Sequence, residues 1–238
     1  MKITYFILIT LFFDLIKKLT IIVPVFNEGK TINELLKKVV DINLVNDIEK
    51  EIIAVDDCSL DNSKDEINRF LAEHKNLIFL ENKVNLGKGG SIRTAITKAS
   101  GEYTVIQDAD LELNPNEIND LLTPVLNNEA DIVYGSRFIN SKKKEKESIL
   151  NRIANKFLTA FGNFCFGVKL TDMQTCYKLI PTSIFKNLQL KENRFAFDPE
   201  VTAKLARDKS LRWKEVAISY DPRTKEEGKK IRWRDGFR

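Results

Sequence analysis

Hydrophobic and polar positions along the first half of the chain form two kinds of block. Short apolar runs, typical of strands buried in a parallel sheet, lie at residues 19–25, 51–55, 77–80, 103–107 and 131–134. The segments between them are amphipathic, with apolar residues at helical spacing, as at Ile32, Leu35, Leu36 and Val39. Strands that alternate with helices of about ten residues are typical of a doubly wound sheet. The pattern therefore predicts a single α/β domain with a mostly parallel sheet flanked by helices.

The pattern changes after residue 134. A charged segment at 142–147 precedes a predicted helix that begins near Ser148. Apolar residues recur along this helix at intervals of three and four, at Ile149, Ile153, Phe157, Leu158, Phe161 and Phe164. We favour a helix that turns this stripe toward the core. The neighbouring lysines and the aromatic content support the alternative of a helix that lies in a membrane interface.

The first 17 residues form a separate apolar segment. The run from Ile3 to Phe13 would span roughly 17 Å as a helix, whereas a bilayer core is about 30 Å thick. No small-residue cleavage site follows it, so a signal peptide is not expected. A shallow membrane anchor, a packed extra helix and an upstream extension from start-site choice remain open. We expect the catalytic domain to occupy residues 18–238.

Composition narrows the class of protein. A chain of 238 residues with 43% hydrophobic residues fits one globular domain. Its three cysteines are scattered and odd in number, so a reduced cytosolic chain is expected. Its single histidine lacks partners for a zinc site or a catalytic triad. The net charge of +4 suits phosphate-bearing ligands or an anionic membrane, and no nucleic-acid partner is expected.

The strongest chemical signal is a pair of carboxylates after the fourth predicted strand. Residues two apart in extended backbone point the same way, so Asp108 and Asp110 project together while Ala109 faces away. Two carboxylates this close repel each other unless a cation lies between them. Mg²⁺ and Mn²⁺ take oxygen ligands and leave room for substrate phosphates. The sequence therefore predicts a metal site that serves a nucleotide diphosphate.

Two further polar segments follow strands. Asp56 and Asp57 end the second strand, where they can accept hydrogen bonds from a base or ribose, and residues 61–63 suit turn and helix-cap roles. Residues 85–90 are glycine-rich at the start of a helix. This segment is either a turn or a helix N-terminus that meets phosphate through residues such as Lys88. It lacks Walker A spacing, which excludes an ATPase loop.

Several motifs occur in the order found in one enzyme family. They lie at residues 21–28, 55–59, 85–89, 108–110, 135–138, 151–155, 171–178, 195–200, 215–223 and 227–231. In this the chain resembles the family 2 glycosyltransferases, which have the Rossmann-like GT-A fold. It is most similar to polyprenyl (dolichyl)-phosphate sugar synthases, which move mannose or glucose from a nucleotide sugar to a lipid phosphate.

The resemblance implies roles for particular residues. Those of the donor nucleotide site would be Pro24, Phe26, Glu28, Asp56, Asp57, Lys88, Asp108 and Ala109. Asp108, Asp110 and Glu112 would serve the metal, with Glu112 at a position often occupied by Gln. The acceptor phosphate would meet Arg137, Arg152, Arg223 and Lys229, because guanidinium groups match phosphate oxygens in pairs. Asp110 and Arg137 would act in catalysis.

The acceptor separates two hypotheses within the enzyme class. A lipid phosphate is already anionic near neutral pH and needs no general base. A sugar hydroxyl in a cell-surface glycan would need one, and Asp198 and Glu200 are the candidates. A nucleotidyltransferase would be expected to open with a glycine- and arginine-rich phosphate loop, which residues 24–28 do not form. A non-catalytic sugar-nucleotide-binding subunit is the alternative of another class.

The expected partners follow from the same resemblance. They are GDP-mannose or UDP-glucose, Mg²⁺ or Mn²⁺, a polyprenyl phosphate and the cytoplasmic face of a membrane. Some family members carry C-terminal transmembrane helices, and this chain ends soon after residue 230. We therefore expect membrane contact through the helix near Ser148, through residues 1–17 or through a separate membrane protein. Cys58 stands where the family usually has Gly, so the turn there is expected to differ. The oligomeric state stays open.

Overall fold

The computed structural model describes residues 16–74, 76–139, 149–194 and 196–223. Its strands are β1 (Lys18–Val25), β2 (Glu49–Asp56), β3 (Leu77–Glu81), β4 (Tyr103–Ile106), β5 (Ile132–Ser136), β6 (Lys178–Pro181) and β7 (Trp213–Ala217). Its α-helices are α2 (Ile32–Asp41), α3 (Ser63–Glu73), α4 (Lys88–Ile96), α5 (Ile118–Leu126), α6 (Ile149–Phe166), α7 (Thr182–Asn187) and α8 (Phe197–Leu205). Two short 3₁₀ turns lie at Val45–Asp47 and Pro115–Glu117.

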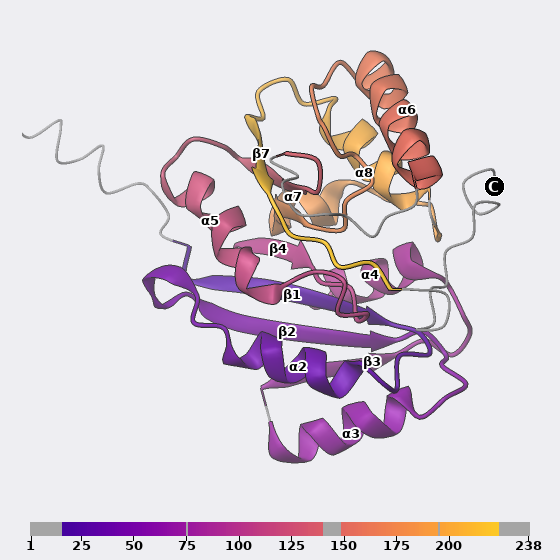
Figure 1. The fold of residues 1–238 in the computed structure, drawn as a ribbon. Helices are drawn as coiled ribbons and strands as arrows, with labels where there is room; N and C mark the ends of the chain where they lie inside the picture. The colour runs from indigo at the N-terminus through magenta and orange to yellow at the C-terminus, as the bar shows by residue number, and fades with distance from the viewer. Residues whose placement is uncertain (1–15, 75, 140–148, 195, 224–238) are drawn as a thin grey trace, which may run out of the picture.

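The seven strands form one sheet in the order β3-β2-β1-β4-β6-β5-β7. All neighbouring pairs are parallel except those of β6, which runs antiparallel to β4 and β5. Helices α2 and α3 lie together on one side of β1–β3, and α4 packs against β1 and β2 (Figure 1). The predicted α/β class and mostly parallel sheet are thus confirmed. The antiparallel β6 lies after residue 134, where no strands were predicted.

The core forms because the central strands are apolar on both faces. Ile21, Ile22, Val23, Val105 and Ile106 are all fully buried. The first five strands were therefore predicted close to their observed positions, since a continuous apolar run fits a strand covered by helices on both sides. The carboxyl ends of β1–β4 point toward one edge of the sheet, where ligands bind in folds of this class.

The orientation of α6 differs from the favoured prediction. Ile153, Phe157, Phe161 and Phe164 expose 60%, 70%, 61% and 87% of their surface, so the apolar stripe faces away from the core. Helical spacing defines a stripe but does not say what covers it, which is why periodicity alone gave the wrong side. Within the described ranges, no helix combines the length and apolarity needed to cross a bilayer. Residues 1–15 lie outside the described residues.

Gly101 allows β4 to begin close beside β1. A Cβ atom placed there would lie 2.7 Å from both the Lys18 carbonyl oxygen and the Thr20 amide nitrogen. These are backbone atoms of a central strand and cannot move aside as a side chain can. The backbone of Gly101 also donates a hydrogen bond to Thr20 Oγ1 at 3.0 Å.

We predict that Gly101→Ala lowers the free energy of unfolding by about 1–3 kcal/mol, the usual cost of overpacking. Urea denaturation followed by circular dichroism measures it. Lys98→Ala, an exposed position three residues earlier, is the control and should change stability little. Equal stability of both variants would contradict the close approach of the two strands.

Candidate active site

The candidate site lies where the ends of β1, β2, β3 and β4 meet. Val25, Asp56 and Glu81 are paired across neighbouring strands, so the residues that follow them emerge side by side. On the other side of β1, Ile22 pairs with Ile106, and Asp108 follows two residues later. From β1 the chain continues to β2 and β3 on one side, while β4 lies on the other side, so the strand order reverses here and this is the switch point of the sheet.

Asp108 and Lys88 form an ion pair at this edge. The Nζ atom of Lys88, the first residue of α4, lies 2.7 Å from Asp108 Oδ1. Burial alone would lower the pKa of Lys88, but the Asp108 carboxylate together with Cys176 and Asp198 outweighs it and holds that pKa well above its usual value. Burial also acts against ionised Asp108, whereas Lys88 acts in the other direction and lowers the pKa of Asp108 overall. Both groups are therefore charged at neutral pH.

Arg223 joins three other carboxylates in the site. Its Nη1 and Nη2 atoms donate to both oxygens of Glu28 at 2.9 Å. Its Nη2 lies 3.6 Å from Asp110 Oδ2, and its Nε lies 3.9 Å from Glu112 Oε1. Glu112 also accepts hydrogen bonds from the Tyr220 hydroxyl and the Arg223 backbone, both at 2.8 Å. The segment after β7 is thereby fastened across the end of β4.

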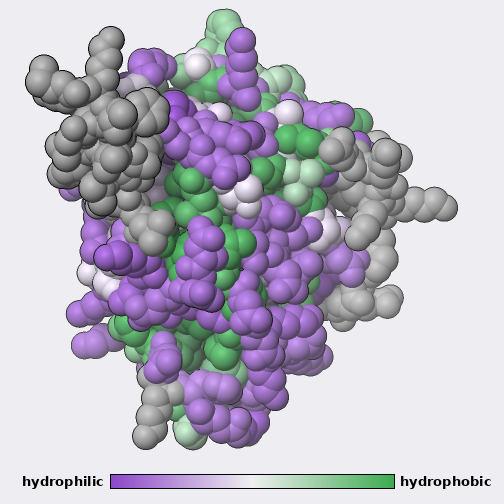
Figure 2. Space-filling model, turned by 90° about the vertical axis from the view of Figure 1, so that its left-hand side faces the viewer, coloured by the Kyte–Doolittle hydropathy of each residue, from purple (hydrophilic) through white to green (hydrophobic). Residues whose placement is uncertain are grey.

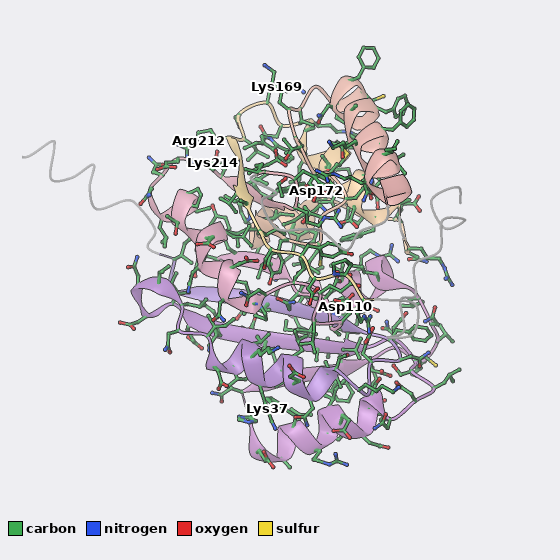
Figure 3. All side chains as sticks on the ribbon, viewed as in Figure 1. Lys37, Asp110, Lys169, Asp172, Arg212 and Lys214 are labelled. Atoms are coloured by element: carbon green, nitrogen blue, oxygen red, sulfur yellow. The ribbon has the colours of Figure 1, made fainter. Side chains whose placement is uncertain are left out.

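Negative charge exceeds positive charge in this cluster. Its carboxylates are Glu28, Asp108, Asp110 and Glu112, and its cations are Lys88 and Arg223. Burial, followed by the charges of Asp108 and Glu112, raises the pKa of Asp110 to about 7. Figure 3 shows Asp110 near the middle of the molecule in this view.

The cluster suits a divalent cation that is also held by a substrate. Its donors are carboxylate oxygens, the ligands that Mg²⁺ and Mn²⁺ prefer. Among the described residues, no group of three or more acidic, histidine or cysteine side chains is arranged to hold a metal by itself. One or two carboxylates completed by phosphate oxygens is the usual arrangement for Mg²⁺ with a nucleotide. Asp108 and Asp110 fit that arrangement, while Glu112 is held by Tyr220 and Arg223.

Asp56 and Asp57 have different surroundings although they are adjacent. Asp57 accepts hydrogen bonds from Asn82 Nδ2 and from the backbone N–H groups of Leu86 and Gly87, at 2.7, 2.9 and 2.7 Å. It therefore fixes the glycine-rich segment before α4. Asp56 is 4% exposed, and its Oδ1 accepts no hydrogen bond from the described residues. A buried oxygen of this kind is costly unless a ligand supplies a donor.

Three other residues predicted for the donor site lie at or just after the ends of β1 and β4. Pro24 is half-buried at the end of β1, and Phe26 directly after it exposes 37% of its surface. Ala109 is buried, as expected for the position that faces away from the carboxylate pair. Cys58 has a φ of 61°, in the left-handed region that glycine adopts without strain. The turn keeps a backbone suited to the usual Gly although a side chain is present.

The glycines of the segment before α4 are explained by close packing. A Cβ on Gly87 would lie 2.6 Å from the Asn193 carbonyl oxygen, and one on Gly89 would lie 2.4 Å from that of Glu192. Gly87 also has a φ of 81°. These contacts place residues 192–194 over the start of α4 and next to Lys88.

Arg137 and Arg152 both lie close to one aromatic ring. Their guanidinium carbons are 5.6 and 6.0 Å from the centre of the Phe138 ring. Arg137 also lies 5.1 Å from the Tyr220 ring, and Tyr220 in turn binds Glu112. Two of the three arginines predicted for the acceptor phosphate are therefore brought together and are linked to the carboxylate cluster through Tyr220, whereas the third, Arg223, lies in that cluster.

Asp172 orients Arg137, and sequence analysis assigned it no role. Its carboxylate is fully buried and accepts from Arg137 Nε at 2.7 Å and from Nη2 at 2.8 Å. The motif at 171–178 contains Asp172, but only the fold reveals its partner. Lys178 in the same motif is also fully buried. Its ammonium group is bonded to Asp198 and lies 5.1 Å from the Tyr134 ring.

Both candidate bases form ion pairs or hydrogen bonds within the protein. Asp198 is paired with buried Lys178, and its charge acts on Lys88 and Cys176, so it lies near the carboxylate cluster. Glu200 accepts from the backbone of Lys191 and Glu192 and pairs with Lys204 at 2.9 Å. The contacts of Glu200 involve none of the other predicted site residues. Lys229 lies outside the described residues.

Comparison with known proteins finds relatives of this chain. The chain is 29% identical to a poly(ribitol-phosphate) beta-glucosyltransferase of Bacillus spizizenii, over 86% of this chain and 31% of that protein. It is 29% identical to a dolichyl-phosphate beta-glucosyltransferase of Dictyostelium discoideum, over 85% of this chain and 66% of that protein. The chain thus spans about a third of the first relative and two thirds of the second.

A solved structure and a family model complete the comparison. Glucosyl-3-phosphoglycerate synthase from Mycobacterium tuberculosis, solved with Mn²⁺, uridine diphosphate and phosphoglyceric acid, has a TM-score of 0.65. The match covers 89% of this chain and 73% of that one at 15% identity, and it confirms the GT-A fold. The family model described as glycosyl transferase family 2 matches residues 20–189. The chain therefore belongs to glycosyl transferase family 2.

Proposed function

We propose that this chain transfers a hexose, either mannose or glucose, from a nucleotide-diphosphate sugar to a polyprenyl phosphate. The observation that carries the proposal is the pairing of two sites of opposite charge. The carboxylate cluster of Asp108 and Asp110 is joined through Tyr220 to the two arginines around Phe138. The dolichyl-phosphate beta-glucosyltransferase among the relatives supports the same class of acceptor.

The donor would bind across the switch point of the sheet. Asp56 Oδ1 is buried without a donor among the described residues, so it suits the imino N–H of uracil or guanine. Phe26 offers an aromatic surface at the end of β1. Lys88 and Arg223 would face the diphosphate. The buried Arg223 Nε has no hydrogen-bond partner in the described structure and suits a phosphate oxygen.

Asp108 and Asp110 would hold Mg²⁺ or Mn²⁺ together with the diphosphate. When bound, the ion supplies positive charge that stabilises the departing diphosphate. The fit rests on the two adjacent carboxylates and on the excess of negative charge around them. Glu112 would act on this site indirectly, through its contacts with Tyr220 and Arg223.

The proposed reaction is a direct displacement with inversion at the anomeric carbon. An oxygen of the lipid phosphate forms a bond to that carbon while the bond from the carbon to the diphosphate oxygen breaks. The nucleoside diphosphate leaves with the electron pair. Arg137 and Arg152 would orient the attacking phosphate, and Asp172 would keep the Arg137 guanidinium in place. A phosphate monoester with a second pKa of about 6 is largely anionic at neutral pH, so no base is required.

The contacts of the candidate bases favour a phosphate acceptor. Asp198 is bonded to a buried ammonium group, and Glu200 accepts hydrogen bonds from two backbone amides. A general base must reach the proton it removes, and these partners compete for its oxygens. Transfer to a sugar hydroxyl is the second candidate function. The nearness of Asp198 to Lys88 and the poly(ribitol-phosphate) beta-glucosyltransferase relative support it.

The place of action would be the cytoplasmic face of a membrane. Sugar nucleotides are cytosolic, and a polyprenyl chain stays in the bilayer. Peripheral contact would bring the phosphate of the lipid to Arg137 and Arg152. Membrane contact through a partner membrane protein, or through residues 1–17 as an additional anchor, is also part of the proposal.

The first test is transfer of labelled sugar. We expect purified protein with Mg²⁺, a short-chain polyprenyl phosphate and radiolabelled GDP-mannose or UDP-glucose to place label in the organic phase. Asp110→Asn should reduce the rate at least about 100-fold, because it removes a carboxylate proposed to hold the metal ion at the diphosphate. Asp120→Asn, an exposed position on α5, is the matched control. Label transferred only to a sugar hydroxyl would favour the second function, and nucleotide binding without any transfer would indicate a non-catalytic subunit.

Asp56 provides a test of the nucleoside site. We predict that Asp56→Asn weakens binding of the preferred nucleoside diphosphate about tenfold, since its buried oxygen loses one charge-assisted hydrogen bond. Isothermal titration with UDP and with GDP measures the affinities and identifies the base. Asp65→Asn, on the exposed side of α3, should bind as the unaltered protein does. Unchanged affinity in Asp56→Asn would contradict the assignment.

Arg152 provides a test of the acceptor site. Arg152→Gln should raise the KM for polyprenyl phosphate about tenfold and leave the affinity for nucleoside diphosphate unchanged, because one charge-assisted contact to phosphate is lost. The control is Arg207→Gln, at an exposed position beyond α8. A change in nucleotide affinity with a constant KM for the lipid would place Arg152 on the donor side instead.

A further inference from the structure

Helix α6 packs on the fold through its small and polar side. Thr159 Oγ1 accepts a hydrogen bond from the Met173 backbone at 3.2 Å. The Asn163 side chain makes two hydrogen bonds to the backbone of Leu170, at 2.7 and 3.0 Å. Gly162 is buried, and a Cβ there would lie 2.6 Å from the Met173 side chain. These contacts fix the rotation of the helix about its axis.

The opposite side of α6 is an exposed apolar face. Ile153, Phe157, Phe161 and Phe164, at spacings of four, four and three, form one stripe that is 60–87% exposed. Figures 1 and 3 show α6 at the rim of the molecule, with side chains that project outward from it. Figure 2 shows the side of the molecule away from α6, where hydrophilic residues cover most of the surface. An apolar helix face held outward by polar contacts marks a surface for a partner.

Within the segment that contains α6, the charged residues are of one sign. No Asp or Glu occurs between residues 148 and 171, a segment that contains Arg152, Lys156 and Lys169. Lys156 and Lys169 are exposed, and Figure 3 shows Lys169 at the upper edge of the molecule. Lys209 adds a further positive charge, with its Nζ 3.3 Å from the Phe166 carbonyl oxygen at the end of α6. Aromatic residues flanked by basic ones suit the interface of an anionic bilayer.

The helix also starts at the proposed acceptor site. Arg152 in its first turn shares the Phe138 ring with Arg137. A bilayer against the outer face of α6 would thus lie beside the residues proposed to bind the phosphate of a membrane lipid. Contact of this kind does not require a membrane-spanning helix.

We propose that the Ile153/Phe157/Phe161/Phe164 face of α6 inserts into the surface of an anionic lipid bilayer and docks the catalytic domain there. The orientation of the docked domain rests on the proposed lipid-phosphate acceptor. The docking itself rests on the exposed face and its surrounding charges. The two claims are therefore tested by separate measurements.

The first experiment is flotation with vesicles of phosphatidylcholine alone or mixed equally with phosphatidylglycerol. The full chain should bind the mixed vesicles, and the triple variant Phe157→Ser/Phe161→Ser/Phe164→Ser should bind them at least about tenfold more weakly. Val84→Ser removes an apolar side chain that is 61% exposed on the β3–α4 segment and should bind normally. Thermal unfolding should be similar for all variants, because the exposed side chains contribute little to the core. Equal binding by the triple variant overturns the proposal, as does absence of binding by the unaltered chain.

A second measurement reports on α6 even if another segment also binds lipid. Cys165 is exposed on α6 and accepts a solvatochromic maleimide after Cys58→Ser. Its emission should shift to the blue on addition of mixed vesicles and be quenched by brominated lipid. The same label at Val84→Cys, with Cys165→Ser and Cys58→Ser, should not respond. No shift at Cys165 overturns the proposal. The proposal is also overturned if the unaltered chain is a dimer and the triple substitution dissociates it while vesicle binding stays intact.

The transfer assay with a short-chain acceptor in detergent-free buffer separates this inference from the proposed function. The triple variant should transfer sugar to that soluble acceptor within about twofold of the unaltered chain, because its substitutions are outside the site. Loss of vesicle binding with retained transfer supports docking through α6. Failure of transfer by the unaltered chain would refute the proposed acceptor and leave the vesicle result to decide the docking surface.

Discussion

The charge imbalance at the end of β4 is the constraint on which the rest of the site depends. Glu28, Asp108, Asp110 and Glu112 converge there from two segments of the chain, and Lys88 and Arg223 neutralise part of their charge. Burial and the neighbouring carboxylates leave Asp110 with a pKa of about 7. Buried charges are costly unless they are paired. The cluster therefore holds the α4 N-terminus and the segment after β7 in place, and its excess negative charge suits the proposed divalent cation.

This constraint connects parts of the chain that are far apart in sequence. Asp57 fixes the glycine-rich segment that presents Lys88, and residues 192–194 pack against the same segment. Through Glu112, Tyr220 and Arg137, the cluster is in contact with the arginine pair around Phe138. Helix α6 continues from Arg152 and turns its phenylalanines outward. The proposed donor side, the proposed acceptor side and an apolar face thus follow one another across one domain.

The strands and the acidic pair could be predicted from the sequence because their signals are local. A continuous apolar run specifies a buried strand, and the Asp108/Asp110 pair directly follows such a run. The extended backbone assumed for the pair was wrong, because β4 ends at Ile106 and Ala109 and Asp110 lie in a turn. The partners of buried charges are not local. Asp172 and Lys178 are fully buried and meet Arg137 and Asp198 only through the fold, so their roles could not be predicted. The orientation of α6 was predicted wrongly for a related reason. On its inward side, Thr159 and Asn163 make hydrogen bonds and Gly162 lies close to the Met173 side chain. These contacts outweigh the usual preference for buried phenylalanine.

The most direct test of the central claim is a crystal structure with Mn²⁺ and the preferred nucleoside diphosphate. The account predicts an anomalous Mn²⁺ peak bounded by the carboxylates of Asp108 and Asp110 and by oxygens of the diphosphate. It also predicts that Lys88 and Arg223 lie against the diphosphate. A nucleotide bound at Asp56 with no Mn²⁺ at the carboxylate pair, or a Mn²⁺ site elsewhere in the domain, would contradict the account.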